Sequence, residues 1–185
     1  MTAATLRAPT LFPLAKPPLA RGIARMAAAS PIASEGHEVE YHRMTVHSLL
    51  NRTNSQRGFP FQWSINPYRG CEFGCRYCYA RYTHEFMELH DAADFEQKIF
   101  IKDNAAHLLE QELRRLPEGQ GIAIGTATDP YQPAEREFGA TRAILEKLAE
   151  REGLSLSITT KSDQVLRDLD VLKDSQLTLH AVFPE

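Results

Sequence analysis

The strongest constraint on the fold is a repeated passage from helical to strand-like patterning in the second half of the chain. Helices are expected at 104–116, 141–152 and 163–172, and each is followed by an apolar strand, at 121–125, 154–159 and 177–183. A further strand is expected at 61–65, before a turn at Asn66–Pro67. This alternation predicts an α/β fold with a parallel sheet. Right-handed crossovers would bring the loops after its strands to one edge, where active sites form.

The expected core comes from the inward faces of the three helices. The apolar residues assigned to these faces are Ala105, Leu108, Leu109, Leu116, Ile144, Leu145, Leu148, Val165, Leu166, Leu169 and Leu172. Asp163 is expected to cap the third helix, because a carboxylate oxygen can accept from a free amide of the first turn.

The first 34 residues differ from the rest, because they are rich in Ala and Pro and hold four basic residues and no acid. They lack helical or alternating periodicity, so we expect a disordered leader at 1–34, a transition segment at 35–60 and the N-terminal part of a larger core at 61–185. The last expected strand has no helix after it, although parallel strands are normally covered on both faces. The sequence therefore predicts a fragment of a longer fold.

Composition favours a soluble protein without a membrane partner. No stretch approaches the roughly 18 consecutive apolar residues of a membrane helix. The whole chain has a formal charge of -3, and residues 35–185 hold 17 basic against 24 acidic residues, or -7. Because nucleic-acid binding usually draws on a positive surface, a nucleic-acid partner would need a local basic groove.

All three cysteines, Cys71, Cys75 and Cys78, fall within eight residues. An odd number at this spacing closes no useful disulfide loop, and thiols persist in reducing compartments, so the cysteines indicate metal binding in a cytoplasmic protein. The spacing CxxxCxxC can place each thiolate on a different iron of a cubane cluster and leave the fourth iron without a protein ligand. Such an iron can bind a substrate.

Three alternatives use the same cysteines. A structural zinc site completed by a histidine such as His84 would make the chain a zinc-stabilised binding module, although zinc sites usually combine two ligand pairs and no second pair is visible. Three reduced structural cysteines on a buried loop are disfavoured by the polar neighbours Glu72, Arg76 and Arg81. An electron carrier is disfavoured because ferredoxins close the cluster with a fourth cysteine.

The cysteine spacing, with the aromatic Tyr77 directly before the last cysteine, resembles the signature of the radical SAM superfamily. The resemblance implies a [4Fe–4S] cluster and S-adenosyl-L-methionine, which is cleaved by one electron to methionine and a 5′-deoxyadenosyl radical that abstracts hydrogen from a substrate. It covers roughly residues 45–185. It implies a partial (β/α) barrel, truncated after about four strands, and an electron donor such as a flavodoxin or ferredoxin as partner.

Three segments, at 64–71, 78–81 and 126–135, narrow the resemblance to the spore photoproduct lyase-like branch. Spore photoproduct lyase repairs a thymine dimer in DNA and uses a further cysteine to return a hydrogen atom to the product radical. This chain has only the three clustered cysteines. We therefore expect cleavage of S-adenosylmethionine without efficient repair of spore photoproduct. The sequence identifies neither the substrate nor a catalytic residue.

The resemblance also implies which residues bind S-adenosylmethionine. They are Tyr77, Gly125, Thr126, Thr128, Asp129 and Lys161. The loop from Gly125 is expected to meet the methionine amino group, although this chain lacks the Gly-Gly-Glu that relatives commonly carry there. Lys161 is expected to approach the methionine carboxylate, and Tyr77 to lie beside the adenine.

Overall fold

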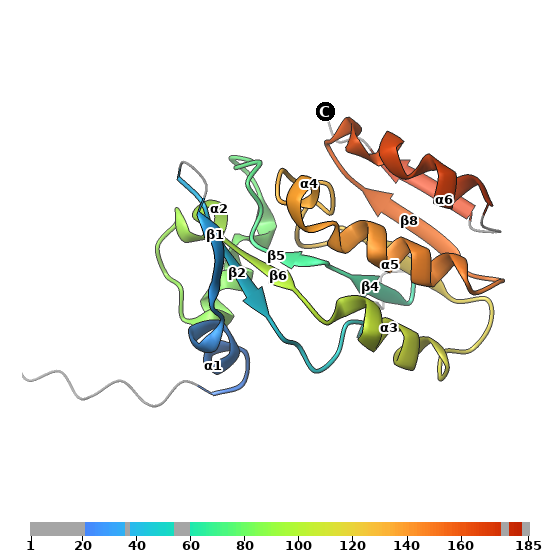
Figure 1. The fold of residues 1–185 in the computed structure, drawn as a ribbon, viewed down its shortest axis with the longest axis horizontal. Helices are drawn as coiled ribbons and strands as arrows, with labels where there is room; N and C mark the ends of the chain where they lie inside the picture. The colour runs from blue at the N-terminus through green and yellow to red at the C-terminus, as the bar shows by residue number, and fades with distance from the viewer. Residues whose placement is uncertain (1–20, 36–37, 54–59, 175–177, 183–185) are drawn as a thin grey trace, which may run out of the picture.

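The structure is a computed structural model that describes residues 21–35, 38–53, 60–174 and 178–182. The larger of its two sheets has the order β3-β4-β7-β8-β9, formed by Asn51–Arg52, Trp63–Ile65, Gly121–Ile124, Ser155–Thr159 and Thr178–Val182. The smaller has the order β1-β2-β6-β5, formed by Ile32–Glu35, Glu40–Met44, Lys98–Lys102 and Tyr68–Arg69. The chain runs directly from β4 into β5, which joins the two sheets into one mixed α/β fold (Figure 1).

The larger sheet is parallel from β4 to β9, which confirms the parallel sheet that the sequence predicts. β4 pairs with β7, β7 with β8 and β8 with β9, each in parallel register. Ala123 of β7 lies opposite Ser64 of β4 and Ser157 of β8. The observed strands differ from the expected ones by at most two residues at either end. β3, which pairs antiparallel with β4, was not predicted.

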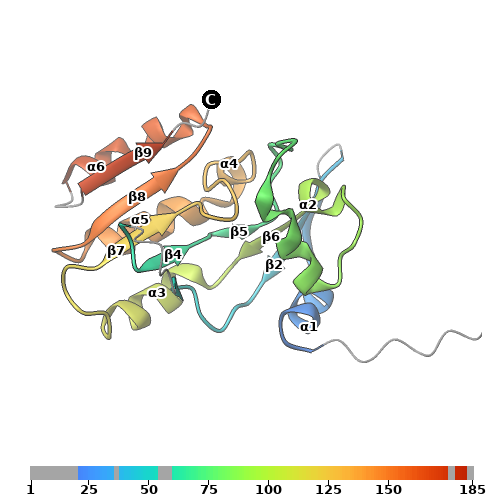
Figure 2. The ribbon, with the colours of Figure 1, turned by 180° about the vertical axis from the view of Figure 1, so that it is seen from behind.

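Helices cover one face of this sheet. α3 (Ala105–Leu113) packs against α5 (Ala140–Ala149), and α5 packs against α6 (Leu169–Asp174). Figure 1 shows the three helices in front of the strands, and Figure 2 shows the strands in front of the helices. The core between the two layers joins Leu109, Ile144, Leu145 and Leu148 of the helices to the apolar side chains of β7 and β8. The expected inward faces of the first two helices therefore do form the core, with Leu108 packed at its margin.

The third expected helix differs in detail. It is divided into the 3-10 helix η2 (Asp163–Asp168) and α6, so the tighter turn of η2 changes which side chains face inward. Val165 and Leu172 are buried as expected, but Leu166 is 62% exposed. Ser162, rather than Asp163, caps the helix, because its hydroxyl accepts from the Gln164 amide at 3.2 Å.

The smaller sheet lies within segments that the sequence did not assign to strands. β2 pairs in parallel with β6, while β1 and β5 pair antiparallel with their neighbours. β6 is buried from Ile99 to Lys102. Its core contains Tyr41, Tyr68, Ile99 and Ile101. The expected transition segment at 35–60 thus contributes β2 and β3 to the two sheets.

The expected disordered leader at 1–34 lies outside the described residues as far as residue 20. From there, α1 (Gly22–Ala29) and β1 precede the second strand. Ala27 packs in a cluster with Met44, Met87 and Phe100, because a small side chain lets the helix approach the sheet closely. None of the helices in the described part of the chain combines the length and apolar character needed to cross a membrane.

Candidate functional site

The three cysteines lie on the segment between β5 and the 3-10 helix η1 (Tyr79–Met87). Gly70 begins this cysteine loop with a φ of 83°, which favours glycine, and a Cβ there would stand 2.7 Å from the Lys98 carbonyl oxygen. The amide of Cys71 then donates to the Phe95 carbonyl at 2.9 Å, just before β6. A tight turn, with the Cys78 amide donating to the Cys75 carbonyl at 3.1 Å, brings the last two cysteines together.

Two of the three thiols share one apolar environment. Cys71 is buried and Cys75 and Cys78 are half-buried. Cys71 and Cys78 belong to one apolar cluster with Phe95 and Ala127. Burial raises the pKa of the Cys71 thiol to about 11, and the backbone N–H groups of Asp129 and Phe73 counteract this by hydrogen bonding to its sulfur.

The loop is held on both sides of Cys71 by one buried side chain, that of Gln132. Its Nε2 donates to the Gly70 carbonyl at 3.3 Å, and its Oε1 accepts from the Glu72 amide at 3.0 Å. Nε2 also donates to Thr128 Oγ1 at 3.1 Å, and that hydroxyl donates to the Gly70 carbonyl at 2.5 Å. Gln132 and Thr128 therefore fix the entry of the cysteine loop against the loop that follows β7.

Glu72, inside the cysteine loop, connects it to two further elements. Its Oε1 accepts from the Ala134 amide at 2.8 Å, at the start of α4 (Glu135–Phe138). Its Oε2 accepts from the Tyr41 hydroxyl of β2 at 2.8 Å. Because both carboxylate oxygens are bonded within the protein, Glu72 anchors the loop.

Asp129 joins the loops after β7 and β8. Its Oδ1 accepts from the Tyr131 amide at 2.8 Å and from Thr160 Oγ1 at 2.7 Å, and its Oδ2 accepts from the Lys161 amide at 2.7 Å. Burial raises the pKa of Asp129, and these hydrogen bonds act in the opposite direction. The carboxylate expected to meet a ligand is therefore bonded to the protein itself and positions Lys161.

The other expected ligand residues of the β7 loop are also bonded within the protein. Thr126 Oγ1 accepts from Asn66 Nδ2 at 3.1 Å, and the Ala127 amide donates to Asn66 Oδ1 at 2.8 Å. Gly125 has a φ of 90°, and a Cβ there would stand 2.5 Å from the Thr159 carbonyl oxygen. These contacts bring the ends of β4, β7 and β8 to one edge of the sheet, as the sequence predicts.

Lys161, which follows β8, lies beside Tyr77 of the cysteine loop. The Lys161 Nζ lies 5.9 Å from the centroid of the Tyr77 ring. A hydrogen bond to the Cys75 sulfur raises the pKa of Lys161, with electrostatic attraction to the same sulfur as the next cause. Both side chains are exposed. A cation and an aromatic ring are therefore presented to solvent beside two of the cysteines.

The three thiols are not arranged as the ligand set of a single metal ion in the part of the chain that the structure describes. Among the described residues, no three His, Cys, Asp or Glu side chains gather around a common point as ligands of one ion. Each cysteine of a cubane cluster binds a different iron, so the three thiols of the loop would have to face one cluster when it is bound. His84 contributes no zinc ligand to them, because its Nε2 lies 3.2 Å from the Lys98 carbonyl and its ring packs edge-on against Phe95.

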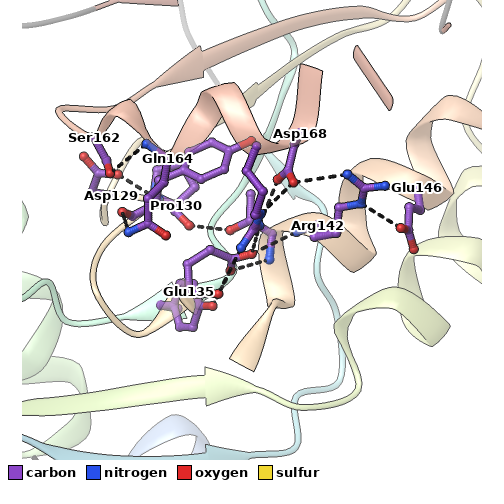
Figure 3. Close-up of polar contacts among 12 residues, drawn as sticks. Asp129, Pro130, Glu135, Arg142, Glu146, Ser162, Gln164 and Asp168 are labelled. Atoms are coloured by element: carbon purple, nitrogen blue, oxygen red, sulfur yellow. Dashed lines mark hydrogen bonds and ion pairs between the residues drawn. The ribbon is translucent and has the colours of Figure 1, made fainter. Parts of the chain in front are cut away.

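A buried ionic network, which the sequence did not predict, supports these loops (Figure 3). Glu135 is fully buried and accepts from the Thr141 and Arg142 amides, at 2.8 and 3.1 Å, and from Arg167 at 2.7 Å. Arg167 also binds the buried Asp168, and Arg142 lies between Asp168 and Glu146. The position of Glu135 shortly before α5 is the available sequence signal, since a carboxylate there stabilises free helix amides.

Comparisons with known proteins agree with the resemblance of the cysteine motif. The family model described as "Radical SAM superfamily" matches residues 65–182. An uncharacterised protein of Mycobacterium tuberculosis is 38% identical over 138 residues, which cover 74% of this chain and 40% of that protein. An uncharacterised protein of Methanocaldococcus jannaschii is 35% identical over 112 residues, covering 60% of this chain and 40% of that protein.

A protein of Acidianus two-tailed virus, also uncharacterised, is 28% identical over 120 residues, which cover 60% of this chain and 38% of that protein. The chain thus spans about 40% of the length of the curated relatives it matches. No solved structure gives a significant match.

Proposed function

Because this chain belongs to the radical SAM superfamily, we propose that its cysteine loop holds a [4Fe–4S] cluster and that the adjoining loops bind S-adenosylmethionine. When bound, the two cofactors would supply a one-electron cleavage that yields methionine and a 5′-deoxyadenosyl radical. The observation that carries the proposal is the placement of Cys71, Cys75 and Cys78, without a fourth cysteine in the chain, beside the ends of parallel strands.

The protein residues would act mainly by positioning. Gln132 and Glu72 hold the backbone on both sides of Cys71, so the buried thiol keeps its place with or without a bound group. The N–H groups that face the Cys71 sulfur would stabilise the thiolate, as donors to cluster sulfurs do. Asp129 fixes the Lys161 backbone.

Two residues are proposed to touch S-adenosylmethionine with their side chains. Lys161 is exposed beside Cys75, where its ammonium can pair with the methionine carboxylate. Tyr77 lies under the same ammonium, where its ring can stack beside the adenine. Gly125, Thr126, Thr128 and Asp129 would instead shape the loop that faces the methionine amino group, since the polar side chains among them are bonded within the protein.

We assign the chain to the spore photoproduct lyase-like branch on the segments around the cysteines and after β7. The assignment includes a reduced flavodoxin or ferredoxin as electron donor. It excludes efficient repair of spore photoproduct, because no cysteine remains to return a hydrogen atom to the product. Conversion of a synthetic spore photoproduct dinucleotide to two thymidines, over many turnovers, would contradict this part.

The test is formation of 5′-deoxyadenosine by the anaerobically reconstituted chain with reductant and S-adenosylmethionine. Wild type should form it, and Lys161→Ala should raise the KM for S-adenosylmethionine about ten-fold, because a charge-assisted contact is worth about 1.5–3 kcal/mol. Lys173→Ala, at an exposed lysine on α6, is the matched control and should change nothing. Absence of 5′-deoxyadenosine from a fully loaded wild type would contradict the proposal.

A further inference from the structure

A cavity of about 260 Å³ opens beside the cysteine loop, at the junction of the two sheets. It is lined by Asn66, Arg69, Tyr82, Phe86, Lys102 and Ala127, among others. Arg69 ends β5 and Lys102 ends β6, so both strands deliver a cation to the same cavity. Tyr82 and Phe86 come from η1, directly after the last cysteine.

Lys102 is buried and Arg69 is half-buried, and both lack an acidic partner among the described residues. Lys102 is 5% exposed, and burial lowers its pKa to about 7, with the nearby Arg69 as the next cause. The Nε of Arg69 is buried without a hydrogen-bond partner. Within the described ranges, neither residue takes part in an ion pair.

Glu112 is not an acidic partner for Lys102. It attracts Lys102 electrostatically. Its carboxylate already accepts from the Leu49 and Leu50 amides, at 3.1 and 2.8 Å, and from the Ser48 hydroxyl at 2.6 Å. A buried ammonium and a half-buried guanidinium that line one cavity without a counter-charge are costly for the folded chain, and a bound anion would offset that cost.

The chemistry of the cavity favours phosphate. A planar guanidinium and an ammonium together match the two charges of a phosphate monoester, and both groups are common phosphate ligands. Tyr82 and Phe86 pack edge to face, with centroids 5.7 Å apart, and each is at least half exposed at the cavity. They offer an apolar wall for the organic part of a ligand. The volume suits a small group, since cavities for drug-sized ligands begin at about 300 Å³.

We propose that this cavity binds the phosphate of a small phosphorylated organic molecule, held between Arg69 and Lys102 beside the cysteine loop. We take this molecule to be the substrate, and that role rests on the radical SAM activity proposed above. Its binding to the cavity does not depend on that activity. The site is distinct from Lys161, which lies beside Cys75 and does not line the cavity.

The test is calorimetric binding of phenyl phosphate to the anaerobically reconstituted chain. Arg69→Gln and Lys102→Met should each weaken binding at least ten-fold, since a hydrogen bond to a charged group is worth about 1.5–3 kcal/mol. Arg136→Gln and Lys173→Met, at exposed positions on α4 and α6, are the matched controls and should bind as wild type. Lys102→Met replaces a buried charge with an apolar chain of similar length, so it keeps the test valid if Arg69→Gln fails to fold.

Three further ligands separate the outcomes. S-adenosylhomocysteine should bind wild type and both cavity variants with equal affinity. If the variants no longer bind it, the cavity belongs to S-adenosylmethionine and the inference is overturned. Tighter binding of benzoate, or of a dinucleotide with one phosphodiester, would overturn the choice of a phosphate monoester. Binding of phenyl phosphate by a chain that does not bind S-adenosylhomocysteine would support the cavity and contradict the proposed function.

Discussion

At the scale of single residues, the polar groups of the β7 loop make hydrogen bonds within the protein that the sequence does not predict. Thr128 and Asp129 were expected to meet a ligand, yet their side chains bond to neighbouring loops. Gln132, which the sequence did not single out, holds both sides of Cys71. A sequence shows that polar residues follow a strand, but which of them faces outward depends on φ and ψ values that a single chain does not reveal.

Gln132→Leu should destabilise the folded chain by about 2 kcal/mol, because it leaves the Glu72 amide without its partner and removes one of the two donors to the Gly70 carbonyl. The variant should also retain less iron, because the backbone on both sides of Cys71 loses its contacts with Gln132. Urea unfolding and iron analysis measure the two effects. Gln111→Leu, exposed on α3, is the control and should leave both unchanged. Full stability of Gln132→Leu would contradict the role given to Gln132.

Lys102 predicts a pH dependence of stability. Its pKa is about 7 in the folded chain, against an ordinary value of 10.5, so the unfolded chain binds more protons between these values. The contribution of Lys102 therefore becomes less unfavourable as pH rises from about 7 to 10.5. Lys102→Met should be more stable than wild type by a few kcal/mol near pH 6 and by much less near pH 10, because each ten-fold change in proton affinity corresponds to about 1.4 kcal/mol.

Urea unfolding at several pH values measures this difference in the free energy of unfolding. Lys173→Met, at an exposed position on α6, serves as control and should differ little from wild type at any pH. A stability difference between Lys102→Met and wild type that does not change with pH would contradict the buried position of the ammonium.

At the scale of elements, the helices and the long apolar strands were predictable, and the smaller sheet was not. β7 and β8 each precede or follow an amphipathic helix, so their pattern is local. β2 pairs with β6 across more than fifty residues, with Tyr41 opposite Ile99, so the local pattern of neither strand reveals its partner. Pairing of this kind is decided by tertiary packing rather than by local propensity.

The turn after β7 gives a prediction at this scale. Gly125→Ala combines a left-handed φ of 90° with a Cβ that would stand 2.5 Å from the Thr159 carbonyl and 2.7 Å from Pro130. Gly153→Ala has a similar φ of 74° but meets no atom within 4 Å. Gly153→Ala is the control, and backbone strain alone should lower its free energy of unfolding by about 1–2 kcal/mol. Gly125→Ala should lower the free energy of unfolding clearly more, because the added Cβ also meets neighbouring atoms. Equal losses in chemical denaturation would show that β7 and β8 do not approach as closely as described.

At the scale of the whole molecule, the two sheets meet at the passage from β4 to β5, and both the cysteine loop and the cavity lie at that junction. The parallel sheet and the common edge of its loops followed from the alternation of helices and strands. The cavity did not, because Arg69 and Lys102 come from strands that the sequence left unassigned. Joining distant segments is the step that a single sequence supports least.

The presence of a cluster on the cysteine loop is tested most directly by iron and sulfide analysis after anaerobic reconstitution. We expect about four iron and four sulfide per chain, with broad visible absorbance. Cys71→Ala, Cys75→Ala and Cys78→Ala should each abolish the absorbance, because each removes the protein ligand of one iron. One zinc per chain without sulfide, or full iron and colour in any of the three variants, would contradict the assignment.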